Sequence, residues 1–370
     1  YELLRITIDR LEPGMMIARN VLSADGRILL FKNSILNNQY ILRLRSMGLG
    51  SLYVKDNLSD IEIPEIISTQ VKSAVSSALK NTMNNFANQK RIDMDMMSKS
   101  VKLLVEDIMS NRNLIIQLED IRTYSDYLMF HSINVAVFSI MTGLSMGYGE
   151  GTLTELALGA LLHDIGMVTI DPNILYKPGE LTVVEKNMVR QHPEIGFNVL
   201  RSYREISTTA AHIAYQHHER VDGTGYPRKF VGKQILEFGK IAAIADTYDA
   251  VISDRPYAKG YSTTDGVTVL RKLAGSYFDP EMVEAFVSNI ATYPIDSLVL
   301  LNTGQIAIVI NVIKSHLQHP LVRVILDKYG HIDNNPVEID IYQNHAINIV
   351  RRLNAEDTEA IIAKMAAKKA

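Results

Sequence analysis

The sequence predicts a mainly α-helical protein with a small strand-rich α+β module at its N-terminus and a small β unit near its C-terminus. Apolar residues recur at three- and four-residue spacing through the middle of the chain, as in helices that pack on a core. Short β-branched runs separated by turn residues precede and follow this helical part. A chain of 370 residues also exceeds the usual size of a single core. We therefore expect four segments, namely a regulatory module over 1–60, a helical linker over 61–120, an all-α domain over 121–292 and a β unit with a helical tail over 293–370.

The composition excludes several classes of function. The formal net charge of -3 offers no basic surface for wrapping polymeric nucleic acid. Cysteine is absent, which excludes disulfides and thiolate metal sites and leaves His, Asp and Glu as possible ligands. No uninterrupted apolar run is long enough to span a bilayer and no signal peptide opens the chain, so we expect a cytoplasmic protein without a membrane span.

The N-terminal module is predicted from a hairpin, a helix and a strand. Asp25 and Gly26 lie between apolar runs in "NVLSADGRILLF", which indicates a hairpin turn. A short helix is expected over about 38–47, and the run "SLYV" predicts a strand. Because the module contains no histidine and no catalytic-looking cluster, we interpret it as a sensory or interaction module.

The linker carries one apolar stripe on an otherwise polar helix. The members of the stripe recur at helical spacing and are Val71, Val75, Leu79, Met83 and Phe86. Such a stripe needs a partner, which is either the next helical segment, from Val101 to Met109, or a second copy of the chain. The second alternative gives a homodimer, which we include among the expected assemblies.

Local signals indicate where the remaining elements begin and end. Thr152 with Glu155, and Thr182 with Glu185, fit the capping box that opens a helix. Near the C-terminus, the runs "SLVLLNTGQIAIVINVI", "LVRVILD" and "VEIDI" predict strands. A helical tail is expected after Asn354.

Histidines and aspartates interrupt apolar helix faces in the predicted all-α domain. Six of the ten histidines lie between residues 131 and 218. The interrupting groups are His131, His163, Asp164, His192, His217, His218 and Asp246. Burying so many ionisable groups is costly unless a divalent metal replaces their hydration. Imidazole and carboxylate ligands suit iron, manganese or zinc, and ligand type alone does not choose among them.

The adjacent pairs have a geometric consequence. Successive residues of a helix point about 100° apart. The His163-Asp164 and His217-His218 pairs can therefore face two neighbouring ions, or one ion and a bridging ligand of its neighbour. His212, one turn before the second pair, is interpreted as structural. The histidines of the C-terminal unit are interpreted as surface or turn residues and are His316, His319, His331 and His345.

The segment from about Arg122 to Ala291 resembles an HD-GYP domain, the branch of the HD phosphohydrolase superfamily that hydrolyses cyclic di-GMP. The resemblance rests on the motifs "YLMFHSINVA", "LLHDIG", "LYKPGELT", "QHPEIG", "HHERVDGTGYP", "IADTYDAVISDRPY" and "FDPEMVEAF". It implies an all-α HD-type fold and hydrolysis of cyclic di-GMP to pGpG, then GMP, by a hydroxide that bridges two metal ions, iron or manganese. The first 55 residues are similar to a small domain often found ahead of HD-GYP domains.

The resemblance also implies roles for individual residues. All seven interrupting groups correspond to metal ligands, and His163 and Asp164 are the implied catalytic pair. Arg255 corresponds to a residue that contacts substrate phosphate. Gly225, Tyr226 and Pro227 form the implied substrate-side loop, which in the family is linked to recognition of diguanylate cyclase domains.

Two positions depart from the family pattern. Met167 stands where the family usually has a lysine after "HDIG", so a cation near the substrate phosphate is missing. Tyr127 stands where some members place a glutamate that holds a third metal, so two metals are expected. A weakly active cyclic di-GMP receptor, and a hydrolase of another cyclic dinucleotide such as the mixed guanine-adenine form, remain as alternatives.

Overall fold

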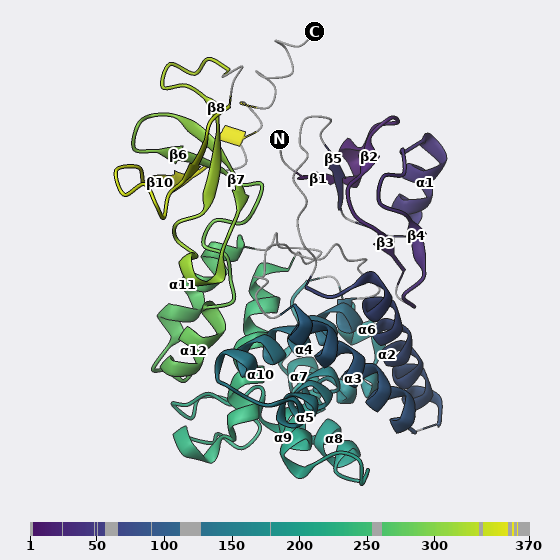
Figure 1. Ribbon diagram of the computed structural model, residues 1–370. Helices are drawn as coiled ribbons and strands as arrows, with labels where there is room; N and C mark the ends of the chain where they lie inside the picture. The colour runs from purple at the N-terminus through teal and green to yellow at the C-terminus, as the bar shows by residue number, and fades with distance from the viewer. Residues whose placement is uncertain are drawn as a thin grey trace.

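The computed structural model describes residues 3–23, 25–47, 49, 51–55, 66–89, 91–111, 127–177, 179–253, 261–332, 336–353, 357, 358 and 361. A helical body forms the largest part of the fold. The N-terminal module and the C-terminal β unit both lie at one end of this body, drawn at the top of Figure 1 in purple and in yellow-green. The predicted mainly α fold with two small strand-containing units is confirmed.

The N-terminal module is a three-stranded antiparallel sheet with a hairpin and one helix. Its elements are β1 (Leu3–Thr7), η1 (Ile8–Arg10), β2 (Met16–Ile17), β3 (Val21–Leu22), β4 (Ile28–Leu30), α1 (Asn38–Ser46) and β5 (Ser51–Lys55). β5 lies between β1 and β2, and β3 pairs with β4 across the predicted turn. The helix begins where the side chain of Asn37 accepts a hydrogen bond from the backbone N–H of Tyr40. The predicted hairpin, helix and strand are confirmed.

The apolar stripe of the linker packs inside this chain. The linker forms α2 (Thr69–Gln89) and α3 (Met94–Ser110), which lie against each other and against the helical body. Val75 and Leu79 are fully buried in the same core as Val101 of α3. The intramolecular alternative therefore accounts for the stripe, and α3 begins seven residues before the predicted start.

The hairpin of the N-terminal module docks on α2. The Ser73 hydroxyl donates a hydrogen bond to the backbone carbonyl of Gly26 at 2.5 Å. Gly26 has a φ of +78°, and a Cβ atom at this position would clash with the Ser73 carbonyl oxygen. A second contact joins Asn20 to Thr69 at 3.1 Å. The glycine of the predicted turn thus also permits close contact between the module and the linker.

The helical body is built on one central helix, α4 (Tyr127–Ser145). The other elements of the body are α5 (Glu150–Leu161), η3 (Ile165–Thr169), α6 (Pro172–Leu175), α7 (Val183–Val189), α8 (His192–Leu200), α9 (Thr208–Gln216), η4 (Gly232–Gln234), α10 (Glu237–Ile252), α11 (Thr263–Leu273) and α12 (Pro280–Val287). α4 contacts α5, α10 and α12 as well as both linker helices. Among the described helices it is the one long and apolar enough to cross a bilayer, unlike our expectation, but 83% of its 18-residue window is buried inside the structure. It occupies the position of a core helix.

One of the two predicted capping boxes is confirmed. The Thr182 side chain accepts a hydrogen bond from the backbone N–H of Glu185, and the Glu185 carboxylate accepts one from the backbone N–H of Thr182. The prediction at Thr152 was wrong, because α5 begins earlier, with Gly149 as its N-cap. Gly149 has the extended backbone that a cap requires, which places Thr152 inside the first turn.

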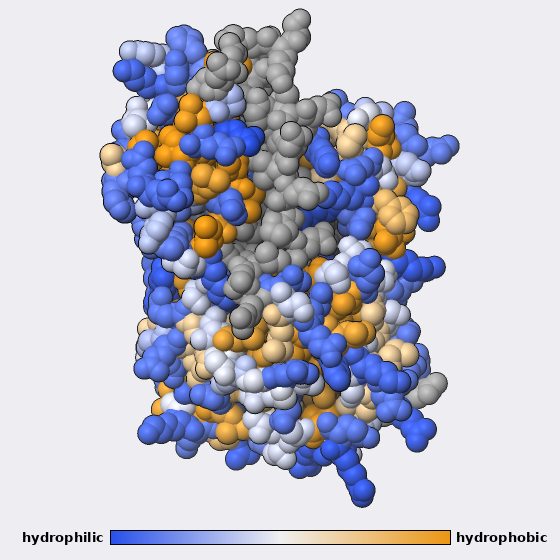
Figure 2. Space-filling model, viewed as in Figure 1, coloured by the Kyte–Doolittle hydropathy of each residue, from blue (hydrophilic) through white to orange (hydrophobic). Residues whose placement is uncertain are grey.

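The C-terminal unit is a five-stranded antiparallel sheet in the order β10-β6-β7-β8-β9. Its elements are β6 (Leu298–Leu301), β7 (Ile306–Asn311), η5 (Lys314–His316), β8 (Leu321–Leu326), β9 (Glu338–Asp340) and β10 (Ile349–Arg352). The predicted runs form β6 to β9, whereas β10 was not predicted. Most of the predicted helical tail lies outside the described residues. Apolar residues gather over both small units on the face shown in Figure 2.

Candidate metal centre

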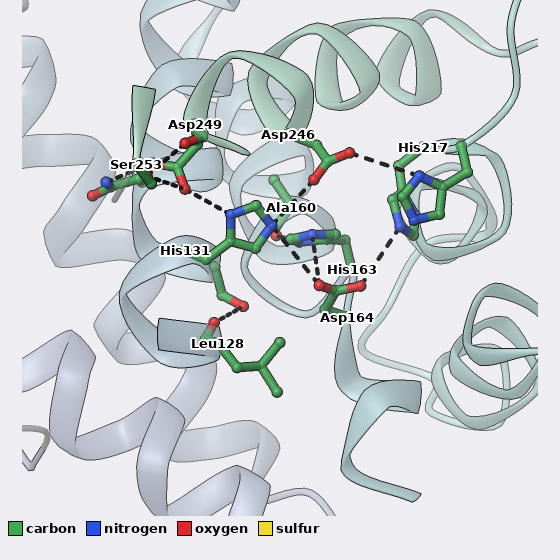
Figure 3. A network of polar contacts seen from close by, with 12 residues as sticks. Leu128, His131, Ala160, His163, Asp164, His217, Asp246, Asp249 and Ser253 are labelled. Atoms are coloured by element: carbon green, nitrogen blue, oxygen red, sulfur yellow. Dashed lines mark hydrogen bonds and ion pairs between the residues drawn. The ribbon is translucent and has the colours of Figure 1, made fainter. Parts of the chain in front are cut away.

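The structure brings the seven predicted metal ligands together at the centre of the helical body. α4 carries His131, α10 carries Asp246, and the pair His163-Asp164 lies between the end of α5 and η3. The first residue of α8 is His192, and the other adjacent pair follows α9. Figure 3 shows side chains from these separate elements pointing toward one another. Apart from the partly exposed His218, all of these side chains are buried.

The ligand atoms form two groups. Each member offers one atom, and within a group these atoms lie within 4.8 Å of one another. The first group contains His131, His163 and Asp164. The second contains His192, His217 and His218. Two adjacent groups of this size fit two neighbouring ions.

Asp164 faces both groups with different oxygen atoms. Its Oδ2 lies 3.4 Å from Nε2 of His163 and 3.8 Å from Nε2 of His131. Its Oδ1 lies 3.2 Å from Nε2 of His192 and 3.6 Å from Nε2 of His217. The carboxylate therefore has the position of a bridging ligand between the groups.

Asp246 also lies between the two groups. Its Oδ1 is 3.1 Å from Nε2 of His131, and its Oδ2 is 3.7 Å from Nδ1 of His218. These two histidines belong to different groups, so Asp246 adds a second carboxylate at the boundary. Two carboxylates among five imidazoles give a mixed oxygen and nitrogen donor set suited to divalent iron, manganese or zinc.

Hydrogen bonding in the centre supports metal ligation. The Nδ1 atoms of His163, His192 and His217 face backbone carbonyl oxygens at 2.7, 2.6 and 3.1 Å. These contacts fix the imidazoles with Nε2 toward the centre. Among the described residues, Nε2 of His163 and Oδ1 of Asp164 are buried and have no hydrogen-bond partner of adequate geometry. Buried polar atoms normally have a partner, and a cation would provide one here.

The loop that contains Gly225, Tyr226 and Pro227 packs directly on this centre. The Tyr226 ring stacks on the His218 imidazole, with the ring centroids 4.6 Å apart. A Cβ atom at Gly225 would lie 2.5 Å from the backbone of His218, Glu219 and Arg220. The glycine is therefore required by close contact with the segment that supplies the second group.

Comparison with known proteins identifies the helical segment. A family model described as an HD domain matches residues 105–282. This segment is an HD domain. A second model, described as a KOW domain associated with the HD domain, matches residues 298–361, which contain the C-terminal sheet. The HD-GYP resemblance predicted from the sequence motifs is confirmed.

Several relatives share the HD domain. The chain is 32% identical over 265 residues to the cyclic di-GMP phosphodiesterase PA4108 of Pseudomonas aeruginosa, covering 72% of this chain and 63% of that one. It is 37% identical over 182 residues to a cyclic di-GMP phosphodiesterase of Thermotoga maritima, covering 49% of this chain and 48% of that one. It is 31% identical over 193 residues to the 3'3'-cGAMP-specific phosphodiesterase 2 of Vibrio cholerae, covering 52% of this chain and 37% of that one. The chain thus spans less than two thirds of the length of these relatives.

Electrostatics in the HD domain favour the ionised forms of Asp164 and Asp246 and the neutral forms of His217 and His218. Burial acts to raise the pKa of Asp164, but the surrounding histidines, led by His163, hold it well below its usual range. Burial also opposes ionisation of Asp246, whose pKa is nevertheless lowered by His131 and then by His218. Burial lowers the pKa of His217, and lowers that of His218 further with the help of its neighbour.

His192 behaves differently from the other imidazoles of its group. Burial acts to lower its pKa, but Asp164, the Val189 carbonyl and Asp246 together raise it. A neutral imidazole and an ionised carboxylate are the forms that bind a metal. The lowered pKa values of Asp164 and Asp246, and those of His217 and His218, therefore favour the forms that bind a metal.

Two buried acids of the HD domain were missed by the sequence reasoning. Asp249 lies three residues after Asp246 on α10, and its Oδ2 is 2.7 Å from Nδ1 of His131 (Figure 3). Glu219 accepts hydrogen bonds from the backbone N–H groups of Arg228 and Phe230 at 2.7 and 3.0 Å, which fixes the loop after Pro227. Spacing on one helix face could have identified Asp249. Nothing local distinguishes Glu219 from a solvated acid.

The remaining predicted residues lie elsewhere. His212 is outside the two groups, where it bonds to the Thr208 carbonyl and contacts Phe197. Met167 is half-buried in η3, three residues after Asp164. Arg255 lies outside the described residues, so its predicted contact with phosphate stays a prediction.

Proposed function

We propose that this protein is a metal-dependent phosphodiesterase that hydrolyses cyclic di-GMP. The position of Asp164 carries the proposal, because one of its oxygens faces His163 at 3.4 Å and the other faces His192 at 3.2 Å. A carboxylate that joins two cation positions suits displacement at phosphorus. The names of the Pseudomonas and Thermotoga relatives support cyclic di-GMP as the substrate.

The proposed reaction is hydrolysis of a phosphodiester. Water attacks one phosphorus of the cyclic dinucleotide, the bond to the ribose 3′ oxygen breaks, and that oxygen takes a proton, which gives linear pGpG. A second hydrolysis gives GMP. Two divalent cations, iron or manganese, would supply Lewis-acid activation of the water and of the phosphate.

The residues of the chain contribute by binding and positioning. The seven predicted ligands would hold the cations, and Asp164, which faces both groups, and His163 would form the catalytic pair. The three backbone carbonyls that hold Nδ1 atoms keep the imidazoles in one orientation. Tyr226 covers His218 and keeps water from one side of the second group. Arg255 would bind a non-bridging phosphate oxygen.

Two alternatives have specific support. Met167 stands in place of the lysine that is expected near the substrate phosphate. The absence of this positive charge favours a receptor that binds cyclic di-GMP and hydrolyses it slowly. The relative from Vibrio cholerae that is named as specific for 3'3'-cGAMP favours a mixed guanine-adenine substrate. Partner recognition through Gly225, Tyr226 and Pro227 by diguanylate cyclase domains, a homodimer and a cytoplasmic location remain predictions.

One assay separates these functions. The protein is loaded anaerobically with iron or manganese and incubated with cyclic di-GMP or with cyclic GMP-AMP, and the products are separated by chromatography. We expect pGpG from cyclic di-GMP, and no product from a variant in which His163 and Asp164 are both replaced by alanine. The circular dichroism spectrum of this variant should remain that of a helical protein. Binding of cyclic di-GMP without product would support the receptor, and faster cleavage of cyclic GMP-AMP would support the mixed substrate.

A further inference from the structure

His131 is supported by a carboxylate, unlike three other histidines of the centre. Its Nδ1 atom lies 2.7 Å from Oδ2 of Asp249. His163, His192 and His217 have their Nδ1 atoms against backbone carbonyl oxygens instead. Asp249 itself is fully buried. The first group of ligands therefore has an anionic support that these backbone contacts do not provide.

The contact with Asp249 fixes how His131 can bind a cation. A carboxylate accepts the Nδ1–H of a neutral imidazole, which leaves the lone pair on Nε2. Nε2 of His131 lies 3.1 Å from Oδ1 of Asp246 and 3.8 Å from Oδ2 of Asp164, so it faces the other ligands. The same contact makes the imidazole a more basic ligand.

Further hydrogen bonds hold Asp249 itself in place. Nδ2 of Asn134, three residues after His131 on α4, donates to Oδ1 of Asp249 at 2.8 Å. Ser253, at the end of α10, donates to the Asp249 backbone carbonyl at 2.5 Å. The carboxylate thus receives groups from α4 on both of its oxygens, which joins the two helices beside the centre (Figure 3). Because both of its oxygens have partners, the Asp249 side chain has little freedom to move when a cation binds to His131.

We infer that Asp249 is a positioning residue for His131 and makes the two cation positions unequal in affinity. Both cation positions share the carboxylates of Asp164 and Asp246, but only the first group contains an imidazole supported by Asp249. In the second group, the imidazoles of His192 and His217 are held by backbone carbonyl oxygens instead. The inference rests on the proposed dinuclear centre, and it predicts which cation depends on Asp249.

The test is the metal affinity of the whole protein with Asp249→Asn. The new amide can donate to Nδ1 of His131, which moves the imidazole proton to Nε2 and blocks ligation. Metal-free protein is titrated with Mn²⁺ against a chelator of known affinity. We expect wild type to bind two ions, and the variant to bind one ion as before and the other about 10–100-fold more weakly. Asp296→Asn, which changes a buried aspartate of the β unit, is the matched control and should bind as wild type does.

A second variant covers the case in which Asp249→Asn fails to fold. Asn134→Ala removes one hydrogen bond to Asp249 and leaves the His131 contact, so it should weaken the same ion by a smaller factor. Mössbauer spectra of iron-loaded protein should show one of the two iron sites changed in either variant. Unchanged affinities and spectra, or equal loss of both ions, would overturn the inference. Metal binding is measured without substrate. A failure of the predicted changes in metal binding would therefore overturn this inference alone, whereas wild-type protein that cleaves no cyclic dinucleotide would overturn the proposed function.

Discussion

The ring of Tyr226 stacks on the imidazole of His218, with 4.6 Å between the centroids and an interplanar angle of 27°. The guanidinium of Arg190 lies over the same tyrosine ring, 5.2 Å from its centroid. Burial raises the pKa of Tyr226, so its hydroxyl stays neutral. The loop predicted to contact substrate or partners therefore also supports a predicted metal ligand.

The first prediction concerns this stack. Tyr226→Ala should weaken metal binding at the second group, because an aromatic contact contributes about 1 kcal/mol beyond the buried area, which corresponds to about fivefold in affinity. Tyr226→Phe keeps the ring and should bind metal as wild type does. The measurement is competition titration with Mn²⁺. Equal affinities for wild type and the alanine variant would show that the stack does not support His218.

The second prediction concerns the glycine before that tyrosine. Gly225→Ala should lower the free energy of unfolding by about 1–3 kcal/mol, because the added methyl meets rigid backbone. The methyl carbon would lie 2.5 Å from that backbone. Gly151→Ala on α5 is the matched control, since nothing lies within 4 Å of its Cβ position. Urea denaturation should show the control unchanged or more stable by up to about 1 kcal/mol. A stable Gly225→Ala protein would contradict the close contact.

The third prediction concerns the pH dependence of stability at the start of α7. Hydrogen bonds from Lys177, and then from Thr182, lower the pKa of Glu185 from 4.5 to about 2. Because the folded pKa lies below the unfolded value, the stabilisation is present above pH 4.5 and is lost as pH falls toward about 2.

Glu185→Gln provides the measurement for this third prediction. The difference in free energy of unfolding between wild type and the variant, both metal-free, should shrink as pH falls through that interval. Other carboxylates titrate in both proteins and cancel in the difference. A difference that stays constant with pH would show that the ion pair with Lys177 does not stabilise the fold.

The fourth prediction concerns Met167. Lysine has an unbranched side chain of similar length, so Met167→Lys should fold. A cation near the phosphate should stabilise the transition state and raise the rate of cyclic di-GMP cleavage, by tenfold for each gain of about 1.4 kcal/mol. Met188→Lys places the same charge on exposed α7 and should leave the rate unchanged. If Met167→Lys alters neither rate nor affinity, residue 167 does not face the substrate.

The sequence was sufficient to predict the helical body and the seven polar residues that the structure brings together, because these residues stood among apolar residues of the helical segment. Their role as metal ligands stays a prediction. The division of six of these residues into two groups was not predictable, since it depends on how four separate parts of the helical body meet in space. β10 was missed because two arginines end a short strand that lies at the edge of its sheet. The start of α5 was misplaced because Gly149 offers no capping side chain, and its backbone conformation is set by the fold.

The central claim is that Asp164 joins two cations held by two groups of histidines. Anomalous diffraction from crystals of manganese-loaded protein tests it most directly. We predict two peaks about 3.5–4 Å apart, one beside His131 and His163 and one beside His192 and His217, with a carboxylate oxygen of Asp164 on each. A single peak, or two peaks of which Asp164 contacts only one, would contradict the account.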